Sequence, residues 1–437
     1  NTKKTKNDEK FFSSDGMKFS TDNKNFNVQY NKNNVPNVPH PNLDKIPQET
    51  DIPLSRIRIV LDMSMINQVL KRTWPSTVLP RIEDIFSYCH NMRYLSKFDL
   101  TQSFWSKKVS KSMQDLSTFY FMGKAYSLTR LAQGSKCSSE VFQASINKVL
   151  LRNNLTLEQN IFYCGGKLCK KLPNCNKQCG HYTYGTFSFI DDIFVVSKTE
   201  EDHYMILEKT LKAFADAKLK VKLEKTELFI TSSCDILGYT LDLHNNCIKP
   251  CQRNIQKILN IPAPTNYKRL QKFIGAVNFY CHLIPNFSNL LAPLTDLLKT
   301  NQAWQWNESH SSAFQTILNK MAAQPVLYIL DPHSPIFAVT DACLKRSIAY
   351  CQLQWNQKLN TWTPIRFQSH KLSGHMVNDS QAQVEALALA TYCSENYPLL
   401  MTHTSHAFTD SRSLTFIARF RYDNLTIWRY HLLISSL

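Results

Sequence analysis

The sequence predicts a chain of several domains that mix α+β and α/β structure. Its 437 residues exceed the roughly 250–300 residues at which a single hydrophobic core stops growing. Hydrophobic residues make up 43% of the chain and only 10 residues are glycine, which favours packed cores over a disordered or fibrous chain. Runs that alternate apolar and polar residues, typical of strands, lie between runs with a helical repeat.

The chain is strongly basic. It carries 51 Lys and Arg against 34 Asp and Glu, a formal net charge of +17. This excess favours a polyanionic partner, nucleic acid or an anionic membrane surface, although a solvated basic surface would have the same composition. No apolar run reaches the roughly 18–20 residues of a membrane span and no signal segment opens the sequence, so we expect an intracellular protein. The 13 cysteines are odd in number and mostly single, which favours reduced thiols.

The first half of the chain predicts strands and helices around two acidic segments. Residues 1–47 are rich in Asn, Lys, Ser and Asp and show no period, which predicts a disordered tail or linker. The next elements are expected in order as a strand at Arg56–Asp62, a helix at Arg81–Cys89, a strand at Tyr94–Leu100 and a helix at Ser139–Leu151. Two β-prone runs over Tyr184–Ser197 then predict a hairpin with Asp191 and Asp192 at its turn.

The second half begins with an amphipathic helix expected at Glu200–Ala217. Two strands should follow around Leu237–Tyr239. After Pro250 the pattern becomes helical, and the segment from Lys249 to Lys299 holds seven basic residues and one acidic residue. The last part predicts a strand at Pro335–Asp341, a helix around Glu385 and a strand ending at Asp410.

Aspartates that end apolar strands are the strongest chemical signal. Two carboxylates about 4 Å apart repel each other by roughly 4 kcal/mol at an effective dielectric constant of 20. A divalent cation reverses that sign, so converging strand-borne aspartates are candidate metal ligands. Asp191 and Asp192 taken alone would equally suit a solvated turn.

An ordered series of motifs surrounds these aspartates. Asp99 follows Lys97-Phe98, and the stretches Leu131–Gln143, Phe189-Ile-Asp-Asp192 and Leu237-Gly-Tyr239 come after it. This series resembles the reverse transcriptases of retroviruses and gypsy-type long-terminal-repeat retrotransposons. The resemblance continues through Leu270–Gly275, and Thr340-Asp-Ala342, Glu385–Ala388 and Thr409-Asp-Ser411 are similar to the acidic motifs of ribonuclease H.

The resemblance implies a right-hand polymerase of fingers, palm and thumb, followed by a connection and a ribonuclease-H-like domain. We expect a disordered tail or linker at 1–47, fingers and palm at 48–248, a thumb and connection at 249–325, and a ribonuclease-H-like domain at 326–437. A Cys-rich insert at about 160–185 would interrupt the palm.

The same resemblance implies the polymerase site. Asp99, Asp191 and Asp192 would be catalytic and would hold two Mg²⁺ ions, with Mn²⁺ as an alternative and the Leu100 carbonyl as a further ligand. The predicted contacts to the incoming nucleotide come from Arg58, Phe104, Gln133 and Lys225. Phe104 would exclude a ribose 2′-hydroxyl, and Lys225 would protonate the leaving pyrophosphate. Leu237, Gly238 and Tyr239 would position the primer end.

In the last domain the resemblance implies that Asp341, Glu385 and Asp410 hold Mg²⁺ for hydrolysis of RNA in an RNA–DNA hybrid. The family has a fourth acidic residue, and no matching Asp or Glu occurs before Leu437. We therefore expect a C-terminally incomplete domain with weak or absent ribonuclease H activity.

A cluster of cysteines departs from the family pattern. Cys164, Cys169, Cys175, Cys179 and His181 fall within 18 residues and could ligate Zn²⁺. Their spacing matches no standard zinc motif, so a zinc site and a basic loop with free thiols both stay open.

The sequence thus predicts template-directed DNA synthesis, with RNA template, DNA primer–template, RNA–DNA hybrid and deoxynucleoside triphosphates as partners and with no membrane. The expected location is the cytoplasm, within a virus-like particle or virion, and contacts with other pol or capsid proteins or a dimer stay open. The main alternative is a non-catalytic nucleic-acid-binding relic or partner subunit. A basic membrane-surface protein ranks behind it, because no basic amphipathic helix with a broad apolar face is present.

Overall fold

The computed structural model describes residues 61–70, 79–80, 82–121, 123–163, 180–299, 304–412 and 414. The chain divides into two compact units, 1–60 and 61–437, and the described residues all belong to the second. The predicted tail, most of the predicted strand at Arg56–Asp62 and Arg58 itself therefore lie outside the described residues.

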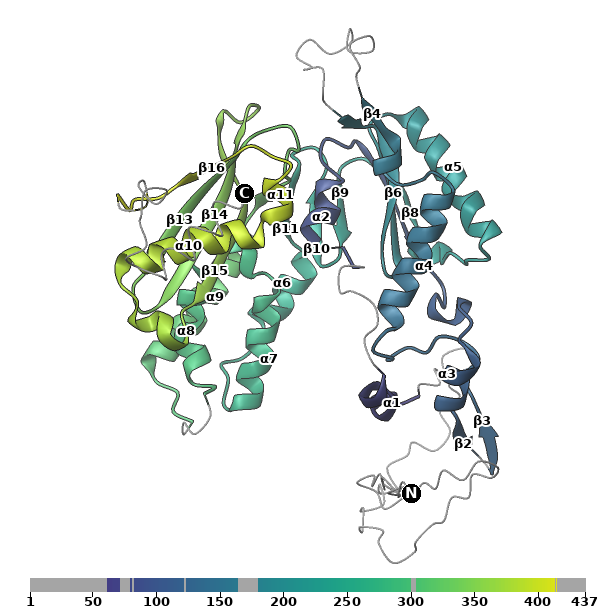
Figure 1. Cartoon of the computed structure of the whole chain (residues 1–437), viewed down its shortest axis with the longest axis horizontal. Helices are drawn as coiled ribbons and strands as arrows, with labels where there is room; N and C mark the ends of the chain where they lie inside the picture. Colours follow the sequence, from purple (N-terminus) through teal and green to yellow (C-terminus); the bar gives the residue numbers. More distant parts are fainter. Residues whose placement is uncertain are drawn as a thin grey trace, which may run out of the picture. The chain divides into compact units, whose positions relative to one another are not determined.

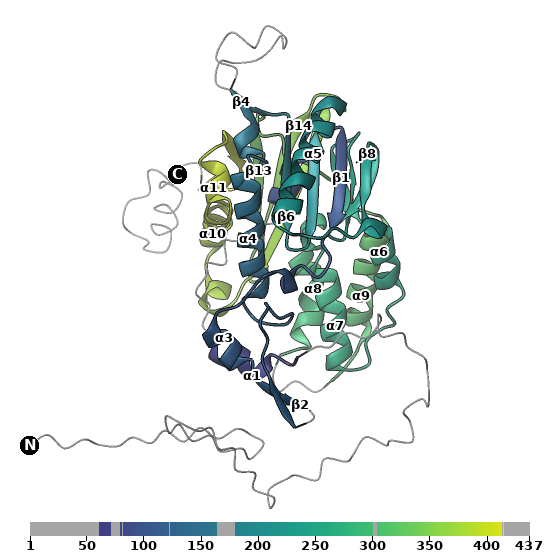
Figure 2. The ribbon, with the colours of Figure 1, turned by 90° about the vertical axis from the view of Figure 1, so that its right-hand side faces the viewer.

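The first sheet carries the predicted acidic hairpin (Figures 1 and 2). Its strand order is β6-β7-β1-β8, and its members are β1 (Tyr94–Asp99), β6 (Tyr184–Phe189), β7 (Asp192–Ser197) and β8 (Glu227–Ile230). Helices α4 (Ser138–Arg152) and α5 (Glu200–Asp216) contact it. The Thr199 side chain caps α5 by accepting from Asp202 N, and three acidic residues in the first turn suit the helix dipole.

Shorter elements surround this sheet. They are α1 (Ser64–Val69), α2 (Ile82–Ser87), η5 (Phe104–Ser106), α3 (Lys111–Leu116), β2 (Phe119–Phe121), β3 (Lys124–Tyr126), η6 (Glu158–Asn160), β4 (Ile161–Tyr163), β5 (Gly180–Tyr182) and η8 (Leu223–Lys225). The β2–β3 and β4–β5 pairs each form a two-stranded sheet.

A second sheet and a group of helices follow along the chain. The sheet has the order β12-β11-β10-β9, with β9 (Ser233–Ile236), β10 (Tyr239–Asp242), β11 (Cys247–Pro250) and β12 (Leu327–Tyr328). The helices are α6 (Gln252–Leu259), α7 (Tyr267–Asn278), η9 (Cys281–Leu283), α8 (Phe287–Asp296) and α9 (Glu308–Ala322). Side chains of α2, β1, β10 and α6 to α9 share one apolar core.

The third sheet has the order β15-β14-β13-β16. Strands β13 (Ile336–Cys343), β14 (Ser347–Asn356) and β15 (Thr361–Lys371) are antiparallel, and β16 (Ser405–Phe408) runs parallel to β13. Helix α10 (Gln381–Glu395) crosses β13 and β14 (Figure 1), with η10 (Gly374–Asn378) before it and α11 (Tyr397–Leu400) after it.

The predicted mixture of α+β and α/β structure is confirmed. One detail of the prediction is wrong. Asp192 is the first residue of β7, so the hairpin turn holds Ile190 and Asp191 instead of both aspartates. The two strands predicted around Leu237–Tyr239 are confirmed as β9 and β10, which pair with each other. In the described part of the chain, no helix is long and apolar enough to cross a membrane.

Candidate active site

Three aspartates converge where β1 ends and β7 begins. Asp99 lies directly opposite Asp192 in the antiparallel β1–β7 pair, and Asp191 precedes Asp192 in the turn. Asp191 O accepts from Leu100 N (3.1 Å), which ties the turn to the end of β1. The sheet therefore brings together carboxylates that are 92 positions apart in the sequence, as predicted.

The turn between β6 and β7 has an unusual backbone. Ile190 has a φ of 53°, a left-handed conformation that a β-branched residue rarely adopts and that costs of the order of 1–3 kcal/mol. Gln143 of α4 compensates from a buried position: its Oε1 accepts from Ile190 N (2.6 Å) and its Nε2 donates to Ser188 O (3.1 Å). The helix thus holds the turn that presents Asp191.

The electrostatics of the cluster favour a cation. Burial raises the pKa of Asp191 above its ordinary value, and the charge of Asp99 adds to this rise while a hydrogen bond from Ser103 Oγ (2.7 Å) opposes it. Burial also raises the pKa of Asp192, reinforced by Asp99 and Asp191 and opposed by Lys97 and Lys225. Mutual repulsion of this kind is what a divalent ion would relieve.

A lysine holds one of the three carboxylates. Lys225, at the end of η8, donates to Asp99 Oδ2 and forms an ion pair with it. The backbone reinforces this arrangement because Lys222 N donates to Asp99 O (2.8 Å). Across the described residues, no three His, Cys, Asp or Glu side chains form a ready-made group that could hold a metal ion. At this site, divalent-ion binding at Asp99 would have to compete with the Lys225 ammonium group.

Phe104 and Leu100 lie on the segment that follows β1 and Asp99. Phe104 begins η5, five residues beyond Asp99, and its ring packs against Phe142 of α4 at a centroid distance of 5.4 Å. It is 9% exposed, so the ring forms one wall of the core. Leu100, a predicted carbonyl ligand, forms an isolated bridge with Val221 just beyond β1.

Gln133 lies in a loop that α1 secures. Asn67 Nδ2 donates to Gly134 O (2.9 Å), and Asn67 Oδ1 accepts from Lys136 N (2.7 Å). Gly134 has a φ of 86°, a conformation that suits glycine. One amide side chain of α1 therefore sets the path of the loop that carries Gln133.

The predicted primer-positioning residues form the tight turn between β9 and β10. Leu237 and Gly238 both have positive φ, 50° and 88°, and Gly238 O accepts from Tyr280 Oη (2.8 Å). Tyr239 is fully buried, and its hydroxyl donates to Phe279 O (3.0 Å). The Tyr239 side chain thus belongs to the core, so only its backbone and the turn before it are available for the predicted contact.

Glu385, predicted for ribonuclease H chemistry, lies within electrostatic range of Asp341 and Asp410. Glu385 of α10 is 3% exposed, and its pKa is raised by burial and by the charges of Asp410 and Asp341, against a hydrogen bond from Gln381. Its Oε1 accepts from Gln381 Nε2 (2.5 Å), whereas its buried Oε2 has no hydrogen-bond partner among the described residues. A buried carboxylate oxygen without a donor, near two further carboxylates, fits a metal ligand.

The predicted zinc cluster lies almost wholly outside the described residues. Cys164, Cys169, Cys175 and Cys179 fall in 164–179, and of His181 only the backbone in β5 is described. The zinc site stays a prediction.

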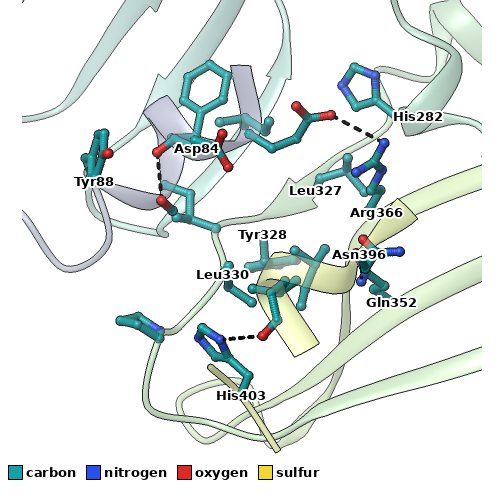
Figure 3. Close-up of a pocket in the computed structure, with 18 of the residues that line it drawn as sticks. Asp84, Tyr88, His282, Leu327, Tyr328, Leu330, Gln352, Arg366, Asn396 and His403 are labelled. Atoms are coloured by element: carbon teal, nitrogen blue, oxygen red, sulfur yellow. Dashed lines mark hydrogen bonds and ion pairs between the residues drawn. The ribbon is translucent and has the colours of Figure 1, made fainter. Parts of the chain in front are cut away.

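The structure also contains a pocket of about 470 Å³ that holds none of the predicted site residues (Figure 3). Its walls come from α2, β12, β15 and the α10–α11 segment. Arg366 lies 3.9 Å from Glu83 across it, and His403 contacts the carbonyl of Leu399. The acidic cluster is therefore separate from this largely apolar pocket.

Three residues that no sequence motif singled out support the site. Ser103 and Gln143 contact the Asp191 turn, and Asn67 contacts the Gln133 loop. Only Gln143 carried a visible signal, because it shares the apolar face of its helix with Ile146 and Leu150 at helical spacing. A polar residue on such a face needs a buried partner.

Two protein families match this chain. Residues 46–241 match the family described as reverse transcriptase (RNA-dependent DNA polymerase), and residues 306–407 match the RNase H-like domain found in reverse transcriptase. The Tf2-3 and Tf2-4 transposon polyproteins of Schizosaccharomyces pombe (strain 972 / ATCC 24843) are 26% identical over 335 residues, 76% of this chain. The match spans only 22% of each polyprotein.

Solved structures of foamy viral protease-reverse transcriptase share the fold. The complex with RNA/DNA hybrid has a TM-score of 0.68 at 21% identity and covers 88% of this chain and 48% of that one. The complex with dsDNA has a TM-score of 0.65 at 21% identity and covers 87% of this chain and 72% of that one.

Proposed function

We propose that this chain, which is the reverse transcriptase and ribonuclease-H-like region of a gypsy-type retroelement pol polyprotein, extends a DNA primer on an RNA or DNA template. The observation that carries this proposal is the convergence of Asp99, Asp191 and Asp192 at one end of the β1–β7 pair. A relic that only binds nucleic acid has no physical need for three repelling carboxylates or for a strained turn that presents one of them.

We propose that the acidic cluster binds a pair of Mg²⁺ ions once the Lys225 ammonium group is displaced from Asp99. Asp99 and Asp191 would hold them, with Asp192 completing the cluster, and Mn²⁺ would suit the same oxygens. The ions would increase the nucleophilicity of the primer 3′-hydroxyl and neutralise charge on the leaving pyrophosphate. The chain's own residues do the positioning: Gln143 and Ser103 orient Asp191, and the Phe104 ring is held against Phe142 of α4.

Lys225 is the proposed proton donor to the leaving pyrophosphate. Its ammonium group already contacts Asp99 from η8, and its side chain is 59% exposed, so the side chain can turn toward a triphosphate at low cost. A lysine ammonium can both bind phosphate oxygens and donate a proton. This supports the predicted role of Lys225 as the donor to pyrophosphate.

Nucleic acid and deoxynucleoside triphosphates are the proposed partners. The +17 charge suits a phosphate backbone, and the foamy viral relatives were solved with dsDNA and with RNA/DNA hybrid. For the ribonuclease-H-like part, we propose that Asp341, Glu385 and Asp410 bind Mg²⁺ next to the RNA strand of a hybrid. A cytoplasmic particle is the proposed location, which suits a chain similar to transposon polyproteins.

The test is primer extension by the Asp191→Asn/Asp192→Asn protein in the presence of Mg²⁺. We expect extension to fall at least a thousandfold, because both groups that bind the cations lose their charge. Binding of template–primer should persist, since the basic residues are unchanged.

Asp216→Asn is the matched control, because Asp216 is an exposed aspartate at the end of α5. It should extend primers like the wild type. Binding without synthesis by the wild-type chain would favour the relic, and unchanged extension by the double variant would refute the site.

A further inference from the structure

The β1–β7 pair carries basic side chains at the end opposite the acidic cluster. Tyr94 lies opposite Ser197 in the pair, so Arg93 and Lys198 lie just beyond this end, and Arg93 N donates to Ser197 O (2.9 Å). Tyr94 and Asp99 are five positions apart along β1, which at about 3.3 Å per residue places the two ends roughly 17 Å apart.

A pocket of about 750 Å³ opens at this basic end. Three cations line it: Arg93, Lys198 and Lys358, the last from the turn between β14 and β15. No Asp or Glu of the described residues lines it. The rest of the wall consists of polar and apolar side chains, namely Asn91, Met92, Tyr94, Thr199, Thr231, Leu243, His244 and Asn246. We call this site the basic pocket.

In the part of the chain that the structure describes, none of the three cations of the basic pocket forms an ion pair. Burial lowers the pKa of Lys198, and the nearby Asp331 opposes this only in part. Asp331 lines a neighbouring pocket. Its Oδ2 already accepts a hydrogen bond from Ser334 Oγ (2.6 Å), and its Oδ1 lies 3.9 Å from His90 Nδ1. Unpaired cations that converge on a concavity favour an anionic ligand.

We infer that the basic pocket binds a phosphate-bearing small molecule of nucleotide size, such as a nucleoside triphosphate or an inorganic polyphosphate. Its volume lies in the range of small-molecule sites and exceeds what a single phosphate fills. The three cations come from three segments, so several anionic groups on one ligand satisfy them better than one. Arg93 supplies a planar fork for phosphate oxygens, and the two lysines supply point charges.

Binding of inorganic tripolyphosphate to the full chain, measured calorimetrically in EDTA at low salt, tests this inference. We expect the Arg93→Gln/Lys198→Gln protein to bind roughly a hundredfold more weakly, because removing each charge-assisted hydrogen bond weakens binding about tenfold. Lys358→Gln lies in an exposed turn, where the substitution leaves the fold intact, and should weaken binding about tenfold.

Lys209→Gln is the control, since Lys209 is an exposed lysine of α5 outside the pocket, and it should bind within twofold of the wild type. Equal affinity of the wild type and the double variant would overturn the inference, as would an equal decrease in Lys209→Gln. A thymidine oligonucleotide that binds through these residues while tripolyphosphate does not would also overturn it. Primer extension should persist in every variant, which separates this test from that of the proposed polymerase.

Discussion

Replacing Lys225 with methionine should strengthen the binding of a divalent cation at the acidic cluster in the absence of nucleotide. The Lys225 ammonium group contacts Asp99 Oδ2, so an ion that uses this oxygen must displace it. Methionine is also long and flexible but carries no charge. The substitution therefore removes the competing cation.

The structure sets the size of this effect. Two unit charges about 4 Å apart attract by roughly 4 kcal/mol at an effective dielectric constant of 20. Because the Lys225 side chain is 59% exposed and that of Asp99 is 22% exposed, solvent screens the pair. A value of about 1 kcal/mol, the upper end for surface pairs, is then appropriate. It corresponds to roughly fivefold tighter binding of the divalent ion.

Titration of the full chain with Mn²⁺, with free ion measured by electron paramagnetic resonance, is the assay. Lys222→Met is the matched control, because Lys222 lies in the same segment but its Nζ faces Glu224 at 4.0 Å instead of Asp99. Equal Mn²⁺ affinity of the wild type and Lys225→Met would refute the reasoning. So would an equal gain in Lys222→Met, which would point to a general charge effect.

Three further substitutions test the packing of the site. Asp192→Asn should raise the free energy of unfolding, measured by urea denaturation at pH 7, by roughly 0.5–2 kcal/mol. Because the pKa of Asp192 is raised in the folded protein, ionisation of this carboxyl group destabilises the fold. The difference in free energy of unfolding between the variant and the wild type should therefore grow as pH rises above about 4. A difference that does not change with pH would contradict this reasoning. Gln143→Leu should cost roughly 1–3 kcal/mol and reduce primer extension at least tenfold, because Ile190 N loses its acceptor; normal extension would disprove this role. Gly238→Ala should lower stability by about 1–2 kcal/mol, since its φ is 88° and the new Cβ would lie 3.1 Å from the Phe279 ring; unchanged urea midpoints would count against it.

Sequence order was sufficient to identify the family and the acidic residues. Asp99 and the Asp191-Asp192 pair stood out because they end apolar, β-prone runs, and a carboxylate in that setting needs a cation or solvent. The hairpin pattern predicted the pairing of β6 with β7, and only the family resemblance brought Asp99 to the same site; the structure pairs Asp99 with Asp192 across β1 and β7. Glu385 was recognisable only from its place between Asp341 and Asp410, since a helical glutamate by itself carries no such signal.

The contacts that support the acidic residues could not be predicted from the sequence in the same way. Gln143 contacts Ile190 across 47 positions, and Lys225 reaches Asp99 across 126. Tyr239 was expected to help position the primer end, yet its ring is buried against Phe279 and Tyr280. These contacts and this burial depend on which side of a strand or turn packs against another element. Local periodicity in the sequence does not specify that packing partner.

The sequence by itself determined the fold class, the resemblance to reverse transcriptases and the candidate acidic side chains, because periodicity and motif order can be read along the chain. Only the tertiary structure decided which groups surround them. It placed Lys225 on Asp99, left Glu385 Oε2 without a donor among the described residues and gathered Arg93, Lys198 and Lys358 around one pocket. Electrostatic interaction depends on distance through space, and residues far apart in the chain come within that distance only when the sheets and helices pack.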